Sequence, residues 1–171
     1  MMLPVEKSSP ELGFTRDRCH FNLRSEMKRI LIVEDDDAIR RSLEIVLAKS
    51  GFIVVEAANG REALAAYQPG QIDAVVLDLI MPDMEGLETL RALRRISPDI
   101  RVLAISGGGR MPSRDYLDMA LKFGAQEALA KPFTSETFIG ALNRVLAMSA
   151  AAAADIASST THCESPPSAR T

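Results

Sequence analysis

The sequence predicts a single α/β domain built on an open, five-stranded parallel sheet with strand order 2-1-3-4-5 and five helices on both faces. Three observations lead to this prediction. Short apolar runs, typical of strands buried on both faces, recur along residues 28–148. Amphipathic stretches with helical spacing lie between these runs. The length of 171 residues favours one domain over two.

The predicted strands are five short runs of mainly apolar residues. The first run is the clearest, because four consecutive apolar residues are typical of a strand with both faces covered. The last run is the weakest, since it contains a glutamate and two alanines. The runs are residues 30–33, 52–56, 74–77, 102–105 and 127–130.

The helices are predicted from spacing and from their end signals. Asp36 or Asp37 can cap the first helix, and Gly51 ends it because glycine tolerates the left-handed conformation. The apolar face of this helix comprises Ile39, Leu43, Val46 and Leu47. Three further helices are expected at residues 61–67, 87–96 and 116–123. Thr134 can cap the last helix, whose apolar stripe is Phe138, Leu142, Val145 and Leu146.

Strands that alternate with helices require right-handed crossovers, which leave few topologies. The flavodoxin-like order is the commonest one at this length, and ligands in such sheets bind beyond the carboxyl ends of the strands. Those ends are therefore where functional residues are expected.

Outside residues 28–148 the pattern is lost. Residues 1–27 are mixed and polar and are predicted to be a flexible leader. Residues 149–171 are rich in Ala, Ser, Thr and Pro and are predicted to be disordered, because they bury too little apolar surface to offset the ordering entropy. Met27 looks like a natural start for the patterned region, so one interpretation is that residues 1–26 are not translated in the native protein.

The composition excludes several classes of function. Hydrophobic residues make up 47% of the chain and charged residues 25%, as in ordinary globular proteins. The net charge of −3 gives no electrostatic reason to expect nucleic-acid binding. No apolar run is long enough to cross a bilayer, and the first residues lack the apolar stretch of a secretory signal. We therefore expect a cytoplasmic protein that binds neither nucleic acid nor membrane.

Charged and polar residues stand at the carboxyl ends of four predicted strands. Glu34 and Asp35 follow the first strand, Asp78 the third, Ser106 the fourth and Lys131 the fifth. Carboxylates held together repel one another unless a cation is present, and such an oxygen-rich site suits Mg²⁺. A lysine opposite the acids can balance their charge and hold an incoming anion.

Four segments in this order resemble the signatures of response-regulator receiver domains, the CheY-like family. They are RILIVEDD at 29–36, LDLIMPDMEG at 77–86, AISG at 104–107 and AKPF at 130–133. The resemblance spans about residues 28–148. It implies a stand-alone receiver domain of a two-component phosphorelay, which is a signalling protein that catalyses phosphoryl transfer only to its own aspartate.

The resemblance assigns Asp78 as the phosphoacceptor and as a ligand of the cofactor Mg²⁺. Asp35 is implied as a direct metal ligand, and Glu34 as a ligand that acts directly or through water. The main-chain carbonyl of Ile80 is implied to complete the protein's share of the coordination shell.

The remaining roles concern the phosphoryl group and the switch. Ser106 is implied to donate a hydrogen bond to a phosphoryl oxygen, and Gly107 to belong to the loop that moves. Lys131 is implied to pair with Asp78 or with the phosphoryl group, and its bond to Pro132 to be cis.

The implied partners are proteins. The phosphoryl donor would be a phosphohistidine on a sensor histidine kinase or on a histidine phosphotransfer protein. We expect the output to be a contact with a downstream protein through the face formed by the fourth helix, fifth strand and fifth helix. A monomer or weak homodimer is expected.

Two positions depart from the family pattern, and the first of them lies before the lysine. Many members carry an aromatic residue or histidine three positions before the lysine, where this chain has Ala128. We therefore expect the signal to travel through the loop Gly107-Gly108-Gly109, which three glycines make easy to rearrange.

Three rival interpretations remain. A hydrolase of the haloacid-dehalogenase type would carry a second acid two residues after the nucleophile, where this chain has Ile80. A flavodoxin-like cofactor module would need phosphate-binding donors after the first strand, where this chain is acidic. A degenerate receiver would bind partners without phosphorylation, although the full set of site residues argues against it.

A prediction follows from Ile80, which is apolar where some family members carry a polar residue able to orient water. We expect Ile80 to shield the phosphoryl group and the phosphorylated form to be long-lived. Ile80→Asn should speed the loss of phosphate, measured as the decay of the phosphorylated species by intact mass. An unchanged rate of phosphate loss would contradict the shielding role of Ile80.

Overall fold

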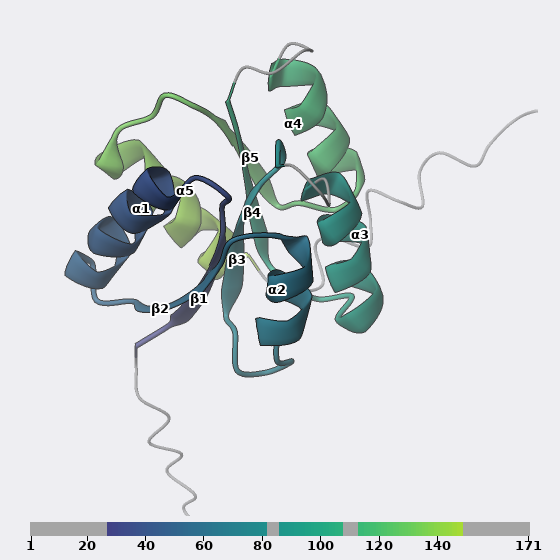
Figure 1. The fold of residues 1–171 in the computed structure, drawn as a ribbon, viewed down its shortest axis with the longest axis horizontal. Helices are drawn as coiled ribbons and strands as arrows, with labels where there is room; N and C mark the ends of the chain where they lie inside the picture. Colours follow the sequence, from purple (N-terminus) through teal and green to yellow (C-terminus); the bar gives the residue numbers. More distant parts are fainter. Residues whose placement is uncertain (1–26, 82–85, 108–112, 149–171) are drawn as a thin grey trace, which may run out of the picture.

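The structure is a computed structural model and describes residues 27–81, 86–107 and 113–148. Residues 1–26 of the leader predicted at 1–27 and the tail predicted at 149–171 lie outside the described residues, as do residues 108 and 109 of the predicted switch loop. The described residues form a central sheet with helices on both sides (Figure 1).

The sheet has five parallel strands in the order β2-β1-β3-β4-β5, which confirms the predicted fold class. The strands are β1 (Arg29–Val33), β2 (Ile53–Ala57), β3 (Ala74–Asp78), β4 (Val102–Ser106) and β5 (Glu127–Ala130). Asp78 and Ser106 are the last residues of adjacent strands, so the topology alone places them at one edge.

Five helices connect the strands. They are α1 (Asp37–Lys49), α2 (Gly60–Ala66), α3 (Gly86–Ile96), α4 (Ser113–Lys122) and α5 (Ser135–Ala147). Helices α1 and α5 cover one face of the sheet, and α2, α3 and α4 cover the other (Figure 1). Among the described residues, none of these helices is long and apolar enough to cross a membrane.

The core is divided by the sheet into two layers, because successive side chains of a strand point to opposite faces. In β1, Ile30 and Ile32 pack with α1 and α5, while Leu31 and Val33 pack with the helices of the other face. All four side chains are fully buried. The apolar runs of the sequence are thus explained by burial on both sides of the sheet.

The structure shows the predicted N-terminal caps at two helices. Asp36 caps α1, since its carboxylate accepts hydrogen bonds from the backbone N–H groups of Ala38 at 2.8 Å and Ile39 at 2.9 Å. Thr134 caps α5 and accepts from the backbone N–H of Thr137 at 3.2 Å. Both caps satisfy amide groups that the first helical turn leaves unpaired.

The prediction that Ile39 belongs to the buried face of α1 is wrong. Its side chain lies in the first turn of α1 and is 36% exposed. Leu43 and Leu47, one and two turns further along, are buried against the sheet. Helix α4 also begins at Ser113 rather than at 116.

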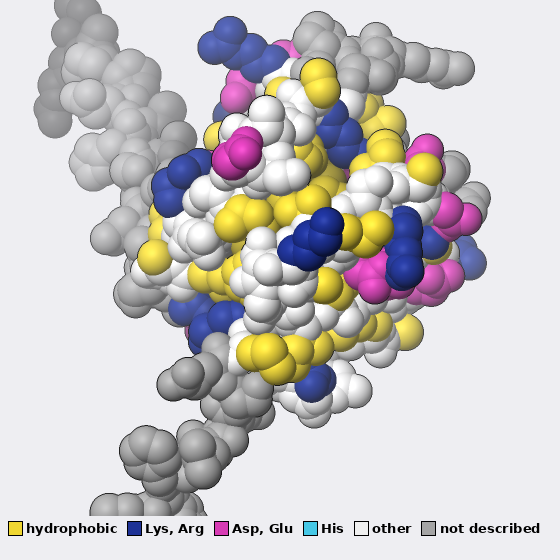
Figure 2. Space-filling model, turned by 90° about the vertical axis from the view of Figure 1, so that its left-hand side faces the viewer, with side chains coloured by type: hydrophobic (Ala, Val, Ile, Leu, Met, Phe, Trp, Pro, Cys, Tyr) yellow, Lys and Arg dark blue, Asp and Glu magenta, His cyan; other side chains and the backbone are white. Residues whose placement is uncertain are grey.

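The surface carries no continuous basic stripe on the face shown in Figure 2, where Lys and Arg side chains lie separately among apolar and acidic ones. Electrostatic binding to a phosphate backbone depends on clustered cations. The expected lack of nucleic-acid binding stays a prediction.

Gly86 lets α3 begin directly against the end of β3. A Cβ atom at this position would lie 2.1 Å from the carbonyl oxygen of Asp78 and 2.5 Å from the Cα of Leu79. The Gly86 N–H donates to the Leu79 carbonyl at 3.2 Å. No L side chain fits without a backbone shift, so α3 is held close to the strand that ends in Asp78.

We predict that Gly86→Ala lowers the free energy of unfolding by about 1–3 kcal/mol or more, because overpacking forces the backbone apart. Gly140→Ala in α5 is the matched control, since its Cβ would make an ordinary 3.5 Å contact with Nη1 of Arg144. Alanine there should stabilise by up to ~1 kcal/mol through helix propensity. Urea unfolding measures the free energy of unfolding of both variants. Equal values for the two variants would contradict the packing argument.

Candidate metal centre at the carboxyl edge of the sheet

Three acidic side chains from separate parts of the chain meet at this edge. Glu34 and Asp35 follow β1, and Asp78 ends β3. One carboxylate oxygen from each lies within 4.8 Å of the others. Parallel strands bring their carboxyl ends to the same side of a sheet, which explains why residues distant in sequence converge here.

Lys131, directly after β5, joins two of the acids. Its Nζ lies 2.7 Å from Oε2 of Glu34 and 2.8 Å from Oδ2 of Asp78. Both carboxylates are almost fully buried, with exposed fractions of 1% for Glu34 and 4% for Asp78. The backbone N–H of Lys131 donates to the Ser106 carbonyl at 2.8 Å and thereby fixes the start of the lysine segment.

The buried group of charges is unbalanced, because one ammonium faces two carboxylates. Burial raises the pKa of Glu34 to about 7, and the charge of Asp78 adds to this effect while Lys131 opposes it. Burial lowers the pKa of Lys131, but the hydrogen bonds that its ammonium donates to Asp78 and Glu34, with the charges of both acids, outweigh this effect and raise the pKa. The lysine therefore stays protonated, and the excess negative charge is relieved by a proton on Glu34 or by a second cation.

The donor set fits Mg²⁺. All three candidate ligands are carboxylates, and Mg²⁺ prefers oxygen ligands while it keeps several of its own waters. Asp35 is exposed, so the site is open to solvent on that side. Lys131 bonds only Oε2 of Glu34, which leaves Oε1 for a metal. In Asp78, Lys131 bonds Oδ2 and the Ile80 amide bonds Oδ1, and a carboxylate oxygen that accepts one hydrogen bond keeps a lone pair for a metal.

Asp78 is oriented by its own strand end as well as by the lysine. The backbone N–H of Ile80 donates to Oδ1 of Asp78 at 3.0 Å. The carboxylate is thus held at both oxygens, one by an amide and one by an ammonium. The metal-ligand role of the Ile80 carbonyl stays a prediction.

Ser106, Gly107 and Pro132 complete the edge. The Ser106 hydroxyl is buried and donates to the Gly107 carbonyl at 3.2 Å. Gly107 packs beside the aliphatic stem of Lys131, since a Cβ atom at this glycine would lie 3.8 Å from Cδ of the lysine. The Lys131–Pro132 peptide bond is cis. Ala128 is half-buried on the α4 side of the sheet.

Arg40 is a contributor that the sequence analysis missed. Its Nη1 donates to the Glu34 carbonyl at 2.8 Å, its guanidinium pairs with Asp37, and its Nε lies 3.8 Å from Glu56. These contacts tie the Glu34–Asp35 turn to α1 and to β2. A signal for it exists in the sequence, since an arginine in the first turns of a helix can reach back to the acidic run that precedes the helix.

Comparison with known proteins assigns this fold and site to a family. The model of the response regulator receiver domain matches residues 30–143. The chain therefore belongs to the response regulator receiver domain family, whose members act as signalling proteins in two-component systems rather than as enzymes that turn over a free substrate.

Individual relatives agree with this assignment. The chemotaxis protein CheY of Thermotoga maritima is 34% identical over 119 residues, which are 69% of this chain and 97% of that protein. The response regulator MprA of Mycolicibacterium vanbaalenii is 38% identical over 118 residues, 69% of this chain and 50% of MprA. A crystal structure of a receiver domain protein from Clostridium thermocellum superposes with a TM-score of 0.66 at 30% identity, covering 70% of this chain and 94% of that one.

We predict that Lys131→Ala destabilises the metal-free protein by about 3–5 kcal/mol above pH 7, because two buried carboxylates lose the ammonium that bonds both of them. The raised pKa of Glu34 means that the folded state binds one proton more than the unfolded chain between pH about 4.5 and about 7, so the loss should shrink as the pH falls through this range. Urea unfolding in a metal chelator measures both effects.

Lys28→Ala is the matched control. Lys28 forms an exposed ion pair with Asp73 at 3.1 Å, and such pairs contribute at most about 1 kcal/mol. A Lys131→Ala loss no larger than the Lys28→Ala loss would contradict the account of the buried charges.

Proposed function

We propose that this protein is a response regulator in which Asp78 accepts a phosphoryl group from a phosphohistidine. The donor is a sensor histidine kinase or a histidine phosphotransfer protein. The observation that carries the proposal is the Lys131 ammonium bonded to both Glu34 and Asp78, with Asp35 beside them. A purely structural acid would need neither the second buried carboxylate nor the open side.

In the transfer, a carboxylate oxygen of Asp78 forms a bond to phosphorus while the phosphorus–nitrogen bond of the phosphohistidine breaks. The electron pair of that bond stays on the imidazole nitrogen, which then takes up a proton. Such reactions depend mainly on positioning and on positive charge around the transferred group. The Ile80 amide and Lys131 hold the carboxylate in one orientation, which supplies the positioning.

Bound Mg²⁺, held by Glu34, Asp35, Asp78 and the Ile80 carbonyl, would neutralise negative charge on the phosphoryl oxygens and on the acids. Lys131 then pairs with a phosphoryl oxygen and keeps its ammonium at the site. A raised pKa suits this role, because the lysine remains charged throughout.

The switch begins at Ser106. In the unmodified protein its hydroxyl donates to the Gly107 carbonyl, and after transfer it turns to a phosphoryl oxygen. That exchange releases Gly107, which leads into the segment before α4. The output is a changed contact with a downstream protein through the α4–β5–α5 face, and the protein acts in the cytoplasm as a monomer or weak homodimer.

The test is incubation with Mg²⁺ and a small acyl phosphate, followed by intact mass measurement. We expect the gain of a single phosphoryl group, which is lost in Asp78→Asn and without Mg²⁺. Asp73→Asn is the matched control, since Asp73 stands just before β3 and pairs at the surface with Lys28. It should leave the mass gain intact.

Two results would decide against the proposal. Absence of a mass gain in the wild-type chain would favour a degenerate receiver that binds without phosphorylation. Continuous release of inorganic phosphate in large excess over protein would indicate a hydrolase of the haloacid-dehalogenase type.

A further inference from the structure

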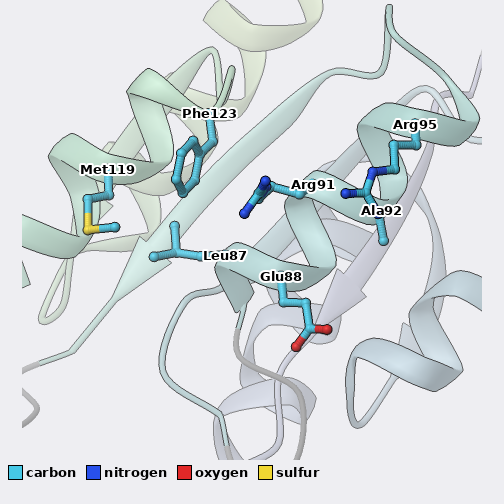
Figure 3. A pocket seen from close by; sticks show the side chains of 7 residues that line it. All are labelled: Leu87, Glu88, Arg91, Ala92, Arg95, Met119 and Phe123. Carbon is cyan, nitrogen blue, oxygen red and sulfur yellow. The ribbon is translucent and has the colours of Figure 1, made fainter.

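We infer that the groove between α3 and α4 binds an acidic, apolar peptide segment of a protein partner. The groove lies away from the acidic centre, and its walls are one side of α3 and the facing side of α4 (Figure 3). It is lined by Leu87, Glu88, Arg91, Ala92, Arg95, Met119 and Phe123.

The apolar part of the groove is open to solvent. Met119 is 38% exposed and Phe123 36% exposed, while Leu87 is buried at the base. The volume of the groove is about 490 Å³, within the ~300–1,000 Å³ range of sites that enclose small ligands. A large apolar side chain of a partner would cover Met119 and Phe123 and remove them from water.

The charged part of the groove is cationic and lacks a partner of opposite charge. Arg91 and Arg95 stand one turn apart on α3, and within the described residues neither forms an ion pair. Arg91 instead lies over the ring of Phe123, at 5.4 Å from the centroid. By contrast, other arginines are already paired with carboxylates, namely Arg40, Arg41 and Arg144.

The positions of the charged and apolar side chains indicate which kind of ligand fits the groove. Figure 3 shows Arg91 directed toward Phe123 and Glu88 directed away from it, so the end of the groove next to the apolar side chains is positive. A guanidinium beside an aromatic ring can still donate its N–H groups to a carboxylate. A peptide with acidic residues next to Leu or Phe satisfies both features at once, whereas a phosphate backbone offers nothing to Met119.

The proposal does not require phosphorylation of Asp78, and the surface differs from the α4–β5–α5 face because α3 forms one wall. The test follows ¹⁵N NMR spectra of the full chain during titration with a synthetic peptide of Leu, Phe and Glu. A matched peptide carries Lys in place of every Glu. The Glu peptide should shift the amide signals of Leu87, Met119 and Phe123, and it should do so equally in Asp78→Asn.

Charge reversal gives the decisive comparison. The double variant Arg91→Glu/Arg95→Glu should bind the Glu peptide at least about tenfold more weakly and should prefer the Lys peptide. Arg41→Glu is the control, because Arg41 is an exposed arginine of α1 on the other face of the sheet; it should leave binding unchanged. Thermal unfolding confirms that each variant is folded.

Four results in the titrations would overturn the inference, and a fifth would come from raising the protein concentration. These are equal binding of the two peptides, shifts confined to α1 and α5, unchanged binding in the double variant, and identical shifts with a single-stranded oligonucleotide. Groove shifts that appear on raising the protein concentration alone would identify a second copy of this chain as the occupant and would equally overturn it.

Discussion

The carboxyl edge of the sheet depends on one ammonium group that bonds two buried carboxylates. Lys131 is the element that allows Glu34 and Asp78 to be buried within reach of each other, because unpaired carboxylates at this depth would repel and would lose their hydration. The same contact leaves an excess of negative charge, which a cation from solution can relieve. The bonds that hold the metal-free protein together here thus belong to the same acidic cluster that fits a cation.

The fold could be predicted almost completely from the sequence, because its signals are local. Apolar runs mark strands buried on both faces, and Asp36 and Thr134 carry the capping chemistry of the helices that follow them. Most of the site followed from topology, since parallel strands deliver their last residues to one edge. The convergence of Glu34, Asp35 and Asp78 could be predicted without information on how side chains pack.

What the sequence did not predict depends on distances across the fold. Periodicity places Ile39 on the apolar face of α1, but it contains no information on whether a side chain in the first turn of the helix is covered by other elements. Arg40 was missed because its importance lies in a contact with a backbone carbonyl. The pairing of Lys131 with Asp78 was expected, but its second bond, to Glu34 rather than to Asp35, is likewise a result of three-dimensional geometry.

Gly86 packs directly against the Asp78 carbonyl, which leaves no space between the start of α3 and the end of β3. Because no space separates them, a displacement of the Asp78 carbonyl would push directly on Gly86, the first residue of α3, so a change at the end of β3 reaches this helix through direct contact.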